Sequence, residues 1–189
     1  MEEFGLQNAI LEIDHGDAVY DFDKFPMPAY LALIQKQIER CYTKLHQDAK
    51  ILVNFRDLTD VMPTHPERIL ETVKFLVTLP EKMRIYGIIF EDATGKSVPE
   101  VVGSCTRFIK KVMDDYQYDG HLLVHVHEQF GYKDASTLEV TIPPFFPSSI
   151  FPSSFHSIFP SSITHSLYKT NIVLILLKYT LNRPYFTHH

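Results

Sequence analysis

Continuous apolar runs recur at nearly regular intervals along the first 139 residues, and this recurrence constrains the fold more than any other feature of the sequence. The centres of the runs are separated by roughly 35–42 residues, about the length of one strand, one helix and their two loops. Runs that are apolar at successive positions are typical of parallel strands buried on both faces. The runs occupy residues 9–13, 51–55, 84–90 and 121–126.

Helical patterns fill the intervals between the runs. Apolar residues recur there at the spacing of one helix face, and a proline stands in the first turn of each of the first three segments. Two of the segments are expected to open with a capping box, a Ser or Thr N-cap followed three residues later by Glu. The expected helices are 28–47, 64–79, with Thr64 and Glu67 as the capping box, 97–115, with Ser97 and Glu100, and a last one from about residue 132.

The alternation predicts an α/β protein with about four βα units, which is half of a (β/α)8 TIM barrel. A doubly wound open sheet has the same alternation, and periodicity does not exclude it. No glycine-rich phosphate loop follows any predicted strand, which argues against a nucleotide-binding domain. We therefore expect a partial TIM-barrel domain over residues 1–139 and an irregular C-terminal tail over residues 140–189.

The composition changes sharply at that boundary. All 23 acidic residues and all seven glycines lie before residue 140, whereas the last 50 residues contain three basic residues and no acidic one. The tail repeats "FPSSI", "FPSSF" and "FPSSI", and proline at this density blocks the hydrogen bonds of helices and sheets. We expect the tail to be disordered or to be translated non-coding sequence, such as a retained intron; a genuine tail that binds partners is the alternative.

Composition also bounds the location and the partners. The formal net charge of −5 argues against nucleic acid as a partner. The N-terminus has no basic segment followed by an apolar core, and no apolar run is long enough to span a bilayer. The two cysteines, Cys41 and Cys105, do not form a disulfide framework. We expect a cytoplasmic protein with neither a membrane nor a nucleic-acid partner.

Polar residues follow the predicted strands at their carboxyl ends, where parallel βα folds place their chemistry. His125 and His127 are two residues apart in a strand, so both side chains point to the same face and can supply two adjacent metal ligands. The alternative is a pair of hydrogen-bonded or solvated histidines. His15 is expected to be structural. The other strand-end residues considered are Asp92, Thr94 and Arg56, of which Arg56 could equally form an ordinary ion pair with Asp57.

Two motifs carry a resemblance to a known family. The chain reads "EDATGKSVP" at residues 91–99 and, after a helical segment, "HVHEQFG" at residues 125–131. This resembles the pyruvate carboxyltransferase-like (HMG-CoA lyase-like, DRE-TIM metallolyase) barrels, in which an Asp-Thr-x-Gly-x-x-x-Pro loop precedes a helix and a strand ending His-x-His-(Asn/Asp)-x-x-Gly. The resemblance covers roughly residues 9–139, and it implies barrel strands four to seven.

The resemblance implies a metal-dependent enzyme that forms or breaks carbon–carbon bonds. His125 and His127 would bind Mg²⁺, Mn²⁺ or Zn²⁺, which acts as a Lewis acid on an α-keto or hydroxy acid, with an acyl-CoA as the second partner. Asp92, Thr94 and Arg56 are the residues expected to bind substrate. No catalytic residue is assigned.

The chain also departs from the family pattern. The family's first-strand Asp and Arg and its eighth strand have no counterpart, Ala93 stands where the family has Thr, and Glu128 stands where it has Asn or Asp. We therefore expect the fragment to be inactive as it stands, with open sheet edges that favour self-association. The alternatives are a non-catalytic interaction module or a non-functional truncated product. An unrelated hydrolase is disfavoured because the sequence lacks a Gly-x-Ser-x-Gly motif.

Overall fold

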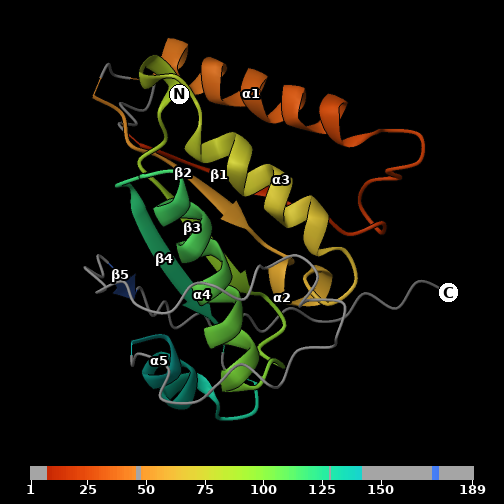
Figure 1. Cartoon of the computed structure of the whole chain (residues 1–189), viewed down its shortest axis with the longest axis vertical. Coiled ribbons are helices and arrows are strands. Elements are labelled where there is room, and N and C mark those ends of the chain that lie inside the picture. Colours follow the sequence, from red (N-terminus) through yellow and green to blue (C-terminus); the bar gives the residue numbers. More distant parts are fainter. Residues whose placement is uncertain (1–7, 46–47, 128, 142–171, 175–189) are drawn as a thin grey trace, which may run out of the picture.

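A computed structural model describes residues 8–45, 48–127, 129–141 and 172–174. The chain is an α/β protein with one parallel sheet whose strands lie side by side in the order of the sequence, β1-β2-β3-β4-β5 (Figure 1). The strands are β1 (Ala9–Ile13), β2 (Ile51–Phe55), β3 (Gly87–Asp92), β4 (His121–Val126) and β5 (Ile172–Leu174). The helices are α1 (Met27–Lys44), α2 (Leu58–Val61), α3 (Pro66–Val77), α4 (Pro99–Asp115) and α5 (Lys133–Thr141), and a 3₁₀ turn, η2, spans Glu81–Met83.

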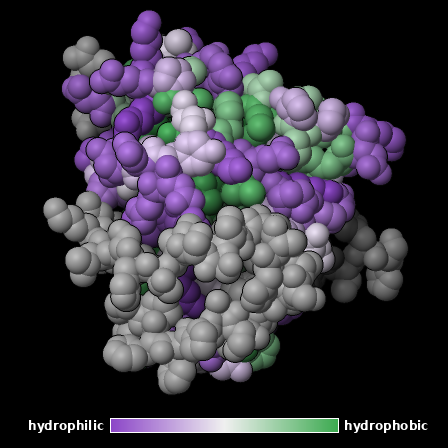
Figure 2. Space-filling model, viewed as in Figure 1, coloured by the Kyte–Doolittle hydropathy of each residue, from purple (hydrophilic) through white to green (hydrophobic). Residues whose placement is uncertain are grey.

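The helices that connect these strands gather on one face of the sheet. Because crossovers between parallel strands are right-handed, strands added in sequence order place successive helices on the same side. Accordingly α3 lies against both α1 and α4, and α4 lies against α5 (Figure 1). Alternate strand residues on that side, such as Val53, Ile88 and Val124, form the hydrophobic core with the helices. On the face seen in Figure 2, hydrophilic side chains prevail over the outer surfaces of α1 and α3.

The other strand residues point to the opposite face of the sheet. Ile89 and Leu123 are buried, yet they do not belong to the core that the helices share. Ile10 stands on the same face of β1, and its side chain is exposed. This second face is the one that carries Glu91 and His125, because these residues keep the alternation of Ile89 and Leu123.

Most expected elements appear where the periodicity placed them. The first, second and fourth apolar runs are strands with the expected bounds. The third strand begins later than the apolar run and continues through Glu91 and Asp92, because β4 pairs with it as far as that point. The short helix α2 and the turn η2 were not expected.

The two predicted capping boxes are wrong. His65 and Val98 occupy the N-cap positions of α3 and α4, and neither forms a side-chain cap hydrogen bond. In each case a proline follows directly, and a residue before proline is pushed out of the helical region. Thr64 donates instead to the carbonyl of Val61. Ser97 donates to the carboxylate of Asp92.

Only part of the expected tail belongs to the described residues. Helix α5 runs to Thr141, two residues beyond the expected boundary, and β5 pairs in parallel with Leu122–Val124 of β4. One of the two sheet edges expected to be open is therefore paired over three residues. The remaining tail, residues 142–171 and 175–189, lies outside the described residues. In the described part of the chain, no helix has the length and apolar character needed to cross a bilayer.

Candidate metal site

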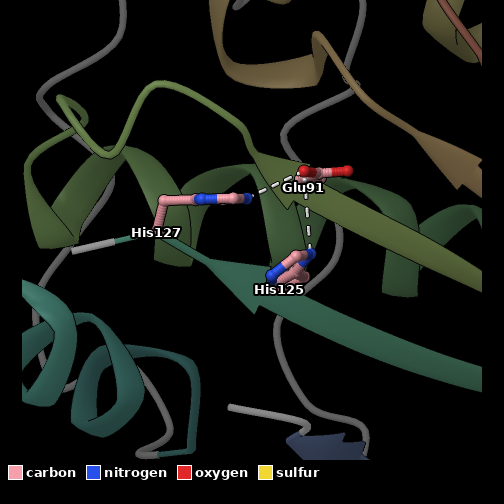
Figure 3. A group of neighbouring side chains, drawn as sticks. All are labelled: Glu91, His125 and His127. Carbon is pink, nitrogen blue, oxygen red and sulfur yellow. Dashed lines mark hydrogen bonds and ion pairs between the residues drawn. The ribbon is translucent and has the colours of Figure 1, made fainter. Parts of the chain in front are cut away.

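The carboxyl ends of β3 and β4 bring one carboxylate and two imidazoles together. Glu91 pairs directly with His125 in the register of the two strands, and His127 follows one step beyond the end of β4. Figure 3 shows both rings turned toward the Glu91 carboxylate. These three residues, the Glu91–His125–His127 triad, form the candidate site.

The distances within the triad suit a small cation. Nε2 of His127 lies 2.9 Å from Oε1 of Glu91, and Nδ1 of His125 lies 3.7 Å from the same oxygen. The ring centroids of the two histidines are 4.5 Å apart, and one ligand atom from each residue of the triad lies within 4.8 Å of the others. Two ligands about 2.1 Å from a tetrahedral ion are roughly 3.4 Å apart, so shifts of about an ångström would complete the coordination. The triad could therefore hold a metal ion.

The protonation state of His125 also favours metal binding. Burial lowers the pKa of His125; Glu91 acts in the opposite direction, and His127 lowers it further. The neutral imidazole, which is the form that binds a metal, is thus the favoured form. Because a carboxylate only accepts hydrogen bonds, Nε2 of His127 donates to Glu91, and a metal would take the place of this proton. Nε2 of His125 is buried and has no hydrogen-bond partner among the described residues.

The loop after β3 lies directly against the end of β4. The backbone N–H of His127 donates to the carbonyl of Asp92 at 3.4 Å. Gly95, with φ +62°, approaches so closely that a Cβ there would lie 2.6 Å from the carbonyl oxygen of His127. The loop between Asp92 and Gly95 therefore fixes the backbone from which the His127 side chain projects.

Asp92 itself does not join the triad. It follows Glu91 on the strand, so its side chain points to the opposite face, where it is fully buried. Its Oδ1 accepts hydrogen bonds from the hydroxyls of Thr59 at 3.2 Å, Ser97 at 3.2 Å and Thr94 at 3.4 Å. Asp92 and Thr94 thus bind each other in the loop, and their expected role in substrate binding stays a prediction.

Arg56 is engaged by protein carboxylates. Its guanidinium donates two hydrogen bonds to Asp14, at 3.0 and 2.8 Å, and lies 3.6 Å from Glu12. The hydrogen bonds and charge of Asp14 raise the pKa of Arg56. Asp57, the partner considered from the sequence, accepts backbone N–H groups of His15 and Gly16 instead, both at 2.7 Å. The Arg56 role in substrate binding stays a prediction.

The remaining histidines and the cysteines lie elsewhere. His15 is fully buried, with its Nε2 2.9 Å from the Thr72 hydroxyl, as expected for a structural residue. His121 starts β4 and lies against Tyr86, with ring centroids 4.4 Å apart. Cys41 and Cys105 are free and buried. Glu128 lies outside the described residues.

Glu91, the third member of the triad, was not among the site residues predicted from the sequence. Of the two adjacent carboxylates that end β3, the sequence prediction named Asp92 and not Glu91. The strand period shows that only one of the two carboxylates shares the face of His125, but it does not show which one. The missing information was the register between β3 and β4.

Comparisons with known proteins do not assign this chain to a family. No protein-family model matches the chain, and no curated protein matches it significantly.

Proposed function

We propose that this chain binds a divalent transition-metal ion through Glu91, His125 and His127. The observation that carries the proposal is the convergence of one carboxylate and two imidazoles from neighbouring strands, within 4.8 Å of one another. Partial burial limits competition from water, and the lowered pKa of His125 keeps one ligand in its neutral form. An exposed pair of histidines would have neither property.

The donor set favours Zn²⁺ over Mn²⁺ and Mg²⁺. Imidazole nitrogen suits Zn²⁺, whereas Mn²⁺ and Mg²⁺ prefer oxygen ligands, and Mg²⁺ also releases its water reluctantly. Two histidines and one carboxylate also leave coordination positions open, which is typical of catalytic rather than structural zinc sites. The open positions would hold water or a ligand oxygen.

The proposed setting is a partial TIM barrel. Sequential strand order with helices on one face supports it, because a doubly wound sheet reverses its strand order and distributes its helices over both faces. The triad lies at the carboxyl ends of the strands, where barrel enzymes place their active sites. The second face of the sheet would then be the barrel interior.

The chemistry proposed for the site follows the resemblance to the HMG-CoA lyase-like barrels. A metal bound by the triad would supply Lewis-acid stabilisation for an oxyanion on an α-keto or hydroxy acid, with an acyl-CoA as the second substrate. Glu91 would provide the carboxylate that the family draws from its first strand. The triad contains a single carboxylate, and no general base is assigned among the described residues. We therefore propose that this chain binds the metal ion but does not turn over a substrate.

One observation favours a second candidate, a non-catalytic metal-binding or interaction module. Arg56 and Asp92, two residues expected to bind substrate, are already engaged by protein groups. A substrate would have to displace Asp14 from Arg56 or break the Asp92 hydroxyl cluster. This candidate shares the metal site and differs only in lacking a substrate.

Metal titration of the purified full chain tests the proposal. Zn²⁺ is expected to bind with a micromolar dissociation constant, Mn²⁺ more weakly, and Mg²⁺ most weakly of the three. Glu91→Gln, His125→Ala and His127→Ala should each weaken binding by more than the roughly 10–100-fold that loss of an outer-shell partner causes. His121→Ala is the matched control, because it removes a histidine about 13 Å away along the same face of β4. Equal binding by the control and the triad variants, or no binding by the unmodified chain, would refute the proposal.

A further inference from the structure

We infer that Asn54 is a positioning residue that commits a single oxygen of Glu91 to the metal. The inference rests on the proposed metal site and extends it to a residue outside the triad. Asn54 lies on β2, on the same face of the sheet as Glu91. Among the described residues, no hydrogen bond joins its side chain to either histidine. Its effect on the metal would therefore be exerted through Glu91.

The two oxygens of Glu91 have different partners. Oε2 accepts a hydrogen bond of 2.5 Å from Nδ2 of Asn54. Both histidine contacts go to the other oxygen, Oε1, at 2.9 and 3.7 Å. Asn54 thus holds the carboxylate by one oxygen and leaves the other facing the imidazoles. Outer-shell hydrogen bonds of this kind orient ligating carboxylates in metal sites.

The orientation of the Asn54 amide follows from chemistry. An ionised carboxylate only accepts hydrogen bonds, so the amide NH₂ must face Glu91. The amide oxygen, Oδ1, then points away; it is buried and has no hydrogen-bond partner among the described residues. Asn54 is only 5% exposed, so leaving this oxygen unpaired is costly. A functional role for the hydrogen bond between Nδ2 of Asn54 and Glu91 would explain why this costly arrangement is present.

The consequence is a restricted coordination mode. A carboxylate that is free at both oxygens can bind a metal through one or both of them. With Oε2 held by Asn54, Glu91 offers one oxygen, and the triad fills three positions around the ion. This leaves room for water or another ligand. If Glu91 bound through both oxygens, it would fill one more coordination position.

Co²⁺ titration of the full chain, followed by its visible absorption, tests the inference. The intensity of the cobalt d–d bands reports the coordination number, which a purely structural residue would not change. Asn54→Leu should weaken Co²⁺ binding by about 10–100-fold, because the carboxylate is no longer held in one orientation. It should also lower the band intensity, because Glu91 is then free to bind through both oxygens. Asn54→Thr, which suits a strand but is too short to reach Oε2, should behave likewise. Asn54→Gln, which keeps the amide donor, should restore part of the affinity.

A matched control exists on α1, where the Gln35 amide donates to the carboxylate of Glu39 at 2.9 Å. Gln35→Leu removes the same kind of bond far from the triad and should leave the cobalt spectrum unchanged. If the unmodified chain binds Co²⁺ and a folded Asn54→Leu or Asn54→Thr variant keeps its affinity and spectrum, the role of Asn54 alone is overturned. If the unmodified chain binds no Co²⁺, both the metal site and the role of Asn54 fail.

Discussion

Residue 95 offers the sharpest test of how the loop after β3 supports the metal site. Gly95 has φ +62°, a left-handed conformation that residues with a side chain rarely adopt. A Cβ at this position would lie 2.6 Å from the carbonyl oxygen of His127 and 3.0 Å from its carbonyl carbon. Both obstacles are backbone atoms, so no side-chain rotation can relieve the contact. We predict that Gly95→Ala displaces the loop from the backbone of His127.

The expected cost has two parts. The left-handed conformation costs a residue with a Cβ about 1–2 kcal/mol. Forcing an added carbon into a filled space typically costs a further 1–3 kcal/mol or so. The total is about 2–5 kcal/mol, a large part of the roughly 5–15 kcal/mol that stabilises an ordinary domain. Moving His127 relative to Glu91 should also weaken metal binding.

Urea unfolding and Zn²⁺ titration of the same samples measure both effects. Gly131→Ala is the control, because Gly131 has a similar φ of +79° but no atom within 4 Å of the added carbon. It should show only the strain, about 1–2 kcal/mol, with unchanged Zn²⁺ affinity. If the two alanine variants lose the same stability, or if Gly95→Ala binds Zn²⁺ like the unmodified chain, the close approach does not support the site.

Three further predictions follow from single residues. Burial tends to raise the pKa of Asp57, but hydrogen bonds from His15 and Gly16 lower it below its usual 3.8. The stabilisation from these bonds should be present above pH 3.8 and should disappear as the pH falls through the lower folded-state pKa. Urea unfolding curves of the unmodified chain and of Asp57→Asn should therefore converge in acid, and a difference in unfolding free energy that stays constant with pH would contradict this. Burial raises the pKa of Cys105 to about 12, so iodoacetamide should label it at pH 8 only in urea, and rapid labelling of the folded chain would show that the thiol is accessible. Arg56→Met should cost less than about 1 kcal/mol in urea unfolding, because its ion pairs are partly exposed; a loss of several kcal/mol would show that they are structural.

The sequence was a good guide to the order of elements. Apolar residues at successive positions predicted β2 and β4 with the bounds that the structure has, because buried parallel strands contain few polar residues. Helix starts were less accurate. Pro66 and Pro99 did mark the beginnings of α3 and α4, but they also moved the N-cap to the residue directly before them.

Sites that depend on distant contacts were less accessible to sequence reasoning. The partner of Arg56 is Asp14, which lies on the neighbouring strand end and not beside it in the chain. The partner of the Asn54 amide is likewise 37 residues away. Sequence spacing reveals pairs within one element, whereas these pairs exist only because strands lie in a particular register.

The sequence alone indicated that the side chains of His125 and His127 point to the same side, because the strand period is two residues for any chain and His127 lies only one residue past β4. It also supplied two adjacent carboxylates, Glu91 and Asp92, at the end of the preceding strand. Only the tertiary structure decided between them: the pairing of Glu91 with His125 places Glu91 on the histidine face and Asp92 among the hydroxyls on the other. A shift of the register by one residue would exchange the two carboxylates, since every side chain of the strand would change face.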